Sequence, residues 1–173
     1  MRPRSSIAEL ALWATGVATV DLASKQIALD TLSARGAAPV ALIDHAVRFA
    51  IVLNDQSAFG VSLGPYTWHI NLVLTFLGLV LSIVLCPSLT VVDGWAPVML
   101  GLIAGAATGN MVSLVFSPDG VPDFIAVTGG HGHEWVFNLA DVAALVGIVM
   151  LIRSARLIGR AVVRVRREGG PPG

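Results

Sequence analysis

The chain has 173 residues, a formal net charge of zero and only 13% charged side chains, while 55% of its residues are hydrophobic. A mean hydropathy of +0.79 excludes an ordinary soluble globular domain, and the single cysteine excludes an internal disulfide or a cysteine-rich metal site. Several apolar runs reach the roughly 20 residues that a helix needs to cross a bilayer. The sequence therefore predicts an all-α membrane protein, with a single four-span membrane domain over residues 1–160.

Four apolar segments are predicted to cross the membrane. They are residues 7–29, 68–85, 97–116 and 135–152. The first begins like a signal peptide but has no convincing small-residue cleavage site, so we interpret it as a retained span. The second is expected to end at Cys86-Pro87, because proline is common just past a helix end, and Cys86 is interpreted as a buried apolar residue.

Arginine gathers at the two ends of the chain. Arg2 and Arg4 precede the first span, and a basic tail, residues 161–173, follows the last. By the positive-inside rule both ends are expected in the cytoplasm. We predict that the tail is disordered and acts as an orientation signal rather than as a nucleic-acid patch.

The two longer connections face the opposite side in this topology. Residues 38–63 are too polar to cross and contain short β-branched runs, so they predict a small extracytoplasmic β-sheet between the first two helices. The polar segment Asn54–Gly60 at its end is compatible with a tight turn. Residues 117–134 hold two prolines and four glycines and are predicted to be irregular.

Small and polar residues indicate how the helices pack. Gly101, Gly105 and Gly109 recur every fourth residue and predict a face that another helix can approach closely. Asn110 is expected to face the bundle interior, where its amide can find partners.

Asp21 and Lys25 lie four residues apart in the first span, on one helix face, and can form an ion pair. One interpretation is an internal pair with the lysine reaching to water. The other is that the pair supports a functional site.

Asp123 and Asp141 flank the second long connection, with Asn138 on the same helix face as Asp141. Carboxylates at the edge of a hydrocarbon layer are costly and are usually functional. If a hairpin brings the two acids together, mutual repulsion keeps one protonated and the other ionised. Such a pair activates water without a metal or cofactor. Helix capping by Asp141 and a loop turn at Asp123 explain the same residues equally well.

His131, His133 and Glu134 lack the helical spacing of a zinc hydrolase. We therefore interpret them as part of a polar loop and expect no metal site.

Five short motifs occur in a fixed order along the chain. They are Asp21-Leu-Ala-Ser-Lys25, Asn54-Asp-Gln-Ser-Ala-Phe-Gly60, Gly105-Ala-Ala-Thr-Gly-Asn110, Val121-Pro-Asp-Phe-Ile125 and Phe137-Asn-Leu-Ala-Asp141. In this order, on a four-span layout, they resemble the motifs of the lipoprotein signal peptidases (signal peptidase II), membrane aspartyl proteases of bacteria.

The resemblance implies an intramembrane aspartyl endopeptidase of the bacterial cytoplasmic membrane. Its substrate would be a diacylglyceryl-modified prolipoprotein, cleaved just before the modified cysteine, and membrane lipids would surround it. The implied catalytic pair is Asp123 and Asp141. The implied substrate-binding and supporting residues are Asn54, Gly60, Asn110, Asn138, Asp21 and Lys25.

The chain departs from the family pattern in three places. The family carries Asp-Arg shortly after Gly-Asn, where this chain has Ser113-Leu114; Gln56 replaces a glycine, and the stretch from Ser113 to Asp123 is one residue longer. A second hypothesis is therefore an inactive relative that serves as an accessory or binding subunit of a larger membrane complex. A small transporter is less favoured, because the acids gather at one face rather than along a path.

Overall fold

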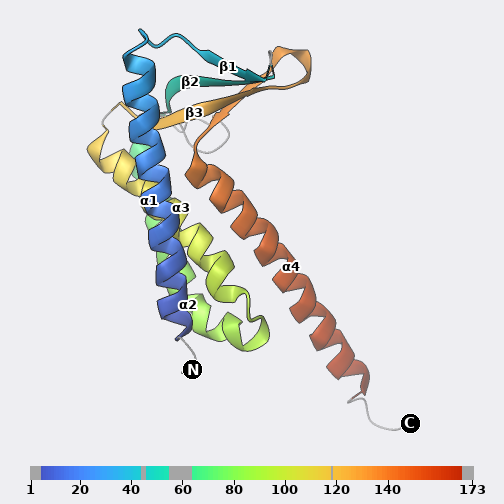
Figure 1. Ribbon diagram of the computed structural model, residues 1–173. Coiled ribbons are helices and arrows are strands. Elements are labelled where there is room, and N and C mark those ends of the chain that lie inside the picture. The colour runs from blue at the N-terminus through green and yellow to red at the C-terminus, as the bar shows by residue number, and fades with distance from the viewer. Residues whose placement is uncertain (1–4, 44–45, 55–63, 118, 169–173) are drawn as a thin grey trace.

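The protein consists of four long helices with a small β-sheet at one end (Figure 1). This computed structural model describes residues 5–43, 46–54, 64–117 and 119–168. All four helices are long and apolar enough to cross a membrane. They are α1 (Ser6–Ser33), α2 (Thr67–Val92), α3 (Ala96–Phe116) and α4 (Leu139–Glu168). The predicted fold class is confirmed.

The sheet is built from both long connections. Its strands are β1 (Val40–Ile43), β2 (Val47–Asn54), β3 (Val121–Thr128) and β4 (Glu134–Phe137), in the order β1-β2-β3-β4 with antiparallel neighbours. The first two follow α1, as predicted. The sheet lies at one end of the molecule, and the start of α1 and the end of α4 lie at the other (Figure 1).

The prediction that residues 117–134 are irregular was wrong. Pro122 lies at the second position of β3, near a strand start, where proline is better tolerated than in a strand interior. Three of the glycines gather between β3 and β4, around the short 3-10 helix η3 (Gly130–Gly132), and form the connection of a hairpin. The residues that suggested a loop therefore bound the strands and do not interrupt them.

Three predicted helix boundaries also differ. Helix α2 continues through Pro87 to Val92, because a membrane helix tolerates an internal proline when its surroundings satisfy the freed backbone groups. Helix α4 begins at Leu139 rather than Trp135, which belongs to β4. The tail predicted to be disordered is helical as far as Glu168; arginine is a good helix former.

Helix α3 is the centre of the bundle and packs against the other three helices. Its glycine face lies on α1, as predicted. A Cβ added at Gly101 would come within 2.6 Å of the Trp13 Cβ atom, and one at Gly105 within 2.6 Å of the Ala14 carbonyl oxygen. Cys86 of α2 is fully buried in the same core, as the sequence suggested.

Replacing Gly105 by leucine should separate α1 from α3, because the new side chain has backbone directly against it. We expect a loss of stability of about 1–3 kcal/mol, the usual cost of forcing atoms into a packed core. Denaturant unfolding in detergent micelles measures it. Gly78→Leu on α2 is the matched control, since a Cβ there meets nothing within 4 Å. Equal stability of the two variants would contradict this packing.

Candidate active site

Asp123 and Asp141 converge on the side chain and backbone of Asn138. The Asn138 Nδ2 atom donates to Asp123 Oδ1 at 2.6 Å, and the Asn138 backbone N–H donates to Asp141 Oδ2 at 3.1 Å. The Asp141 N–H in turn donates to Asn138 Oδ1 at 3.0 Å. Asn138 and Asp141 thus form a reciprocal cap at the start of α4. Asp141 therefore caps the helix and also lies near Asp123, so the two alternatives considered for Asp141 from the sequence are both true.

The sheet places the first acid. Ile125 of β3 pairs with Phe137 of β4, so Asn138 follows β4 at the level where Asp123 lies on β3. Asn54, at the end of β2, lies diagonally across from Asp123 and donates through Nδ2 to Asp123 Oδ2 at 2.9 Å. Both oxygens of this 2% exposed carboxylate therefore accept a hydrogen bond from an asparagine amide.

Asn110 of α3 connects the second acid to the interior of the bundle. Its Nδ2 donates to Asp141 Oδ1 at 3.2 Å. Its Oδ1 accepts from Asn138 Nδ2 at 3.3 Å and from Lys25 Nζ at 2.7 Å. The position expected for Asn110, facing the bundle interior, is confirmed.

The ion pair predicted between Asp21 and Lys25 forms, with Lys25 Nζ 2.6 Å from Asp21 Oδ2. Asp21 is fully buried and Lys25 is 3% exposed, so the interpretation in which lysine reaches to water was wrong. Lysine stays inside because Asn110 and Ser113 also accept from its ammonium group, at 2.7 and 3.3 Å. These contacts offset much of the cost of burying the charge.

Two contacts in this cluster were not anticipated from the sequence. Asp21 Oδ1 accepts the backbone N–H of Ala140 at 2.9 Å, which joins α1 to the first turn of α4. Ser113 supplies the third acceptor for Lys25. Ser113 lies three residues after Asn110, on the same helix face, and this spacing could have indicated from the sequence that Ser113 also faces Lys25.

Ser113 and Leu114, at the positions where the resemblance led us to expect Asp-Arg, occupy different surroundings. Ser113 Oγ lies 3.3 Å from Lys25 Nζ and donates to the Gly109 carbonyl at 3.0 Å. The Leu114 side chain is 5% exposed, and its carbonyl accepts from Trp68 Nε1 of α2 at 3.1 Å. Gly60 and Gln56, singled out in the sequence, lie outside the described residues.

Glu134 is engaged by an arginine across the sheet. Arg48 of β2 donates to it through Nε and Nη2, each at 2.7 Å. Hydrogen bonding to the charged forms lowers the pKa of the Glu134 carboxyl and raises the pKa of the Arg48 guanidinium. Within the part of the chain that the structure describes, no three His, Cys, Asp or Glu side chains are grouped as a metal ion would require.

Burial raises the pKa of Asp123 from an ordinary value of 3.8 to about 6. Hydrogen bonding from Asn54 opposes this rise, whereas the nearby charge of Asp141 adds to it. Asp123 thus changes its protonation state close to neutral pH, which is the property of an acid or base that works in water-mediated catalysis.

Comparison with known proteins assigns the chain to a family. The family model described as Signal peptidase (SPase) II matches residues 13–156. The chain belongs to this family. All the described residues of the Asp21, Asn110, Asp123 and Asp141 cluster fall within that match.

Relatives of this signal peptidase II family member occur among mycobacteria. A lipoprotein signal peptidase of Mycolicibacterium smegmatis is 34% identical over 156 residues, covering 87% of this chain and 62% of the relative. One of Mycobacterium avium is 33% identical, covering 87% of this chain and 80% of the relative. The chain therefore spans less than two thirds of the length of the M. smegmatis relative.

Two solved structures, both of bacterial membrane enzymes studied by the in meso method, share the fold. The 1.9 Å structure gives a TM-score of 0.68 at 21% identity and covers 84% of this chain and 91% of its own. The 2.3 Å structure gives 0.64 at 20% identity and covers 95% of this chain and 93% of its own.

The raised pKa of Asp123 predicts that the folded protein loses stability as pH rises. The folded state holds this proton more tightly than the unfolded chain, so the contribution is complete below pH 3.8 and is lost as pH rises through about 6. A difference of about two pKa units corresponds to about 3 kcal/mol. Thermal unfolding in micelles between pH 4 and 8 measures the loss. It should be smaller in Asp123→Asn, and an equal loss in both proteins would contradict the assignment.

Replacing Lys25 by methionine should leave the Asp21 carboxylate buried without its counter-charge. We expect a cost of about 3–5 kcal/mol, the usual result of removing one partner of a buried ion pair. Denaturant unfolding in micelles measures it, with the exposed neighbour change Gln26→Met as the control. Asp21→Asn combined with Lys25→Met should recover part of the stability. If the single variant unfolds like the wild type, the pair does not hold the bundle together.

Proposed function

We propose that this chain is an aspartic endopeptidase that removes signal peptides from diacylglyceryl-modified prolipoproteins. The observation that carries the proposal is the bridge made by Asn138, which holds one oxygen of Asp123 and one of Asp141. The name shared by the curated relatives, lipoprotein signal peptidase, supports the substrate class.

The proposed reaction needs one ionised and one protonated carboxyl group. The ionised group takes a proton from water as the water oxygen bonds to the scissile carbonyl carbon. The protonated group donates to the carbonyl oxygen, which gives a gem-diol. The proton taken from water then passes to the leaving amine as the C–N bond breaks, and one gem-diol hydroxyl returns its proton to the first carboxylate as the C=O bond forms again. Asp123, whose pKa is about 6, is the proposed donor of the first proton, which leaves Asp141 as the base.

The remaining polar groups keep this pair in place. Asn110 and the Asn138 backbone hold the two oxygens of Asp141, and Asn54 holds Asp123 from the opposite side. The Lys25 ammonium offsets the charge of Asp21. With that pair neutral, the two aspartates sharing one proton would carry a single negative charge, which is less costly to bury than two.

The proposed location is the extracytoplasmic face of a bacterial cytoplasmic membrane. Arg153, Arg156 and Arg160 lie in the C-terminal half of α4. Helix α4 ends at the opposite end of the molecule from the sheet (Figure 1). The positive-inside rule would put that end in the cytoplasm. The aspartates, next to the sheet, would then lie near the outer interface, where a translocated prolipoprotein presents its cleavage site.

Complementation tests the proposal. The chain is expressed in bacteria depleted of their own lipoprotein signal peptidase, and prolipoprotein processing is followed by gel shift. We expect the unmutated chain to restore processing and Asp123→Asn or Asp141→Asn each to reduce it by a factor of 1,000 or more, on the order of the loss seen when a catalytic group is removed. Asp119→Asn, on the exposed loop just before β3, is the matched control and should process normally.

One observation favours a second function. Ser113 and Leu114 stand where the resemblance to the family calls for Asp-Arg. A chain that binds prolipoprotein without cleaving it, as an accessory subunit of a larger membrane complex, would fail to restore processing even unmutated. Copurification of a stable partner from native membranes would support that alternative.

A further inference from the structure

Three exposed arginines lie on one face of the C-terminal half of α4. They are Arg153, Arg156 and Arg160, and together they are called the arginine face below. Their steps of three and four residues bring successive side chains to the same side of a helix. Arg164 and Arg167 continue these steps in the sequence.

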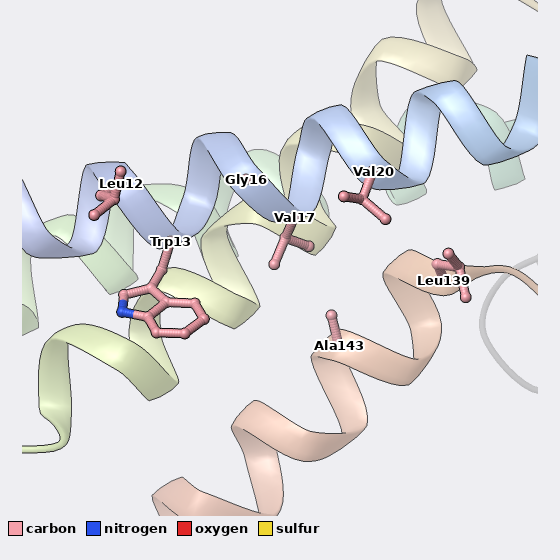
Figure 2. Close-up of a pocket in the computed structure, with 7 residues that line it drawn as sticks. All are labelled: Leu12, Trp13, Gly16, Val17, Val20, Leu139 and Ala143. Carbon is pink, nitrogen blue, oxygen red and sulfur yellow. The ribbon is translucent and has the colours of Figure 1, made fainter.

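The arginine face is turned away from the packed side of α4. Ala143 faces α1 across an apolar pocket (Figure 2). At Gly147 an added Cβ would come within 2.7 Å of the Ile103 Cγ1 atom of α3, and Ser154 is buried. Arg156 follows Gly147 by nine residues, or about two and a half turns, and therefore lies on the opposite side of the helix. The arginine face is thus directed towards the surroundings of the protein.

The ion pair of Arg153 marks the level of the membrane surface. Arg153 Nη1 lies 3.2 Å from Asp93 Oδ2, and Asp93 belongs to the turn between α2 and α3. A turn that joins two membrane helices lies outside the hydrocarbon layer, because its backbone groups need polar partners. In the same turn Trp95 is exposed, as is typical of tryptophan at the boundary between lipid and water. Arg153 therefore reaches that boundary.

Arg156 and Arg160 lie further along α4, at the depth of the lipid headgroups. At 1.5 Å per residue, their Cα atoms are about 5 and 11 Å beyond that of Arg153 along the helix axis. The headgroup layer on each side of a bilayer is about 5–7 Å thick. Side chains of a helix lean towards its N-terminal end, here towards the bilayer, so both guanidinium groups can reach the phosphates. Within the described part of the chain, neither arginine forms an ion pair.

We infer that the arginine face binds the phosphate groups of anionic phospholipids in the leaflet at this end of α4, the cytoplasmic leaflet in the proposed topology. A guanidinium group presents its N–H donors in a plane that matches two phosphate oxygens at once. The orientation of the protein alone does not require this arrangement, because the positive-inside rule counts arginines near the end of a span on whichever face they lie. A lipid beside the helix does require it, since its phosphate meets only one face.

Native mass spectrometry tests the inference without depending on catalysis. The full chain in neutral detergent micelles is titrated with phosphatidylglycerol, or with phosphatidylcholine of the same acyl chains, and the dissociation constant of the first bound lipid is measured. We expect phosphatidylglycerol to bind at least about tenfold more tightly, because each arginine near an anionic lipid surface contributes on the order of fivefold in affinity.

Two results of this titration would overturn the inference. Equal binding of the two lipids would leave the arginine face to an acidic protein partner. Binding of glycerol 3-phosphate as tightly as phosphatidylglycerol would assign it to a soluble phosphate.

Arg156→Gln combined with Arg160→Gln should weaken the binding of phosphatidylglycerol about tenfold or more and change that of phosphatidylcholine less than twofold. The loss follows from removing two of the three charges on the arginine face. Arg35→Gln is the matched control, because Arg35 is also exposed but lies between α1 and β1, and it should change neither affinity more than twofold.

A second variant separates the face from the charge. Ala155→Arg combined with Arg156→Ala keeps the number of arginines, and with it the orientation signal, but moves one of them about 100° around the helix. Ala155 is exposed, so the new side chain meets no packed neighbour. We expect the affinity for phosphatidylglycerol to fall about fivefold. An unchanged affinity in this variant or in the double glutamine variant overturns the inference. Neither result depends on prolipoprotein processing, so the inference and the protease proposal can fail separately.

Discussion

The Lys25 ammonium is the only cation in the buried cluster around the aspartates, among the residues that the structure describes. It donates to Asp21 on its own helix and to Asn110 and Ser113 on α3. A buried ammonium is tolerated only when its hydrogen-bonding capacity is used and a counter-charge is near. Because two of the acceptors of Lys25 lie on α3, these hydrogen bonds fix the position of α1 against α3. Asp21 then receives the Ala140 N–H, which fixes α4 as well.

Close helix packing makes this arrangement possible. The glycine face of α3 lets α1 approach until its backbone touches Gly105, and at Gly109 an added Cβ would meet the carboxylate of Asp21. A side chain at either position would push α1 outwards and stretch the hydrogen bonds from Lys25 to Asn110 and Ser113, which are 2.7 and 3.3 Å long. The small residues therefore allow α1 to approach α3, and the polar cluster fixes how the two helices are oriented. Each depends on the other. In lipid, where apolar surfaces gain little by meeting, such contacts specify helix association.

The sheet adds what the bundle lacks. It joins two connections that are far apart in the chain, so that β2 brings Asn54 to Asp123 on β3 and the β3–β4 hairpin delivers Asn138. The second acid comes from a helix and the first from a strand. This difference in support places one carboxylate within the sheet and the other at the start of a membrane helix, with Asn138 between them.

Much of this protein was determined by local sequence pattern. Apolar runs of membrane length specify the four helices, because each helix satisfies its own backbone in lipid. The spacing of Asp21 and Lys25, and of Asn138 and Asp141, puts each pair on one helix face wherever the helix lies. Tertiary structure decided the rest. Whether Lys25 turned to water or inwards depended on acceptors 85 and 88 residues away, and the strand character of residues 121–128 depended on pairing with β2. The convergence of Asp123 and Asp141 on Asn138 depended on the register of β3 and β4. Those contacts join residues distant in the chain, and their energies exist only once the helices and strands have packed.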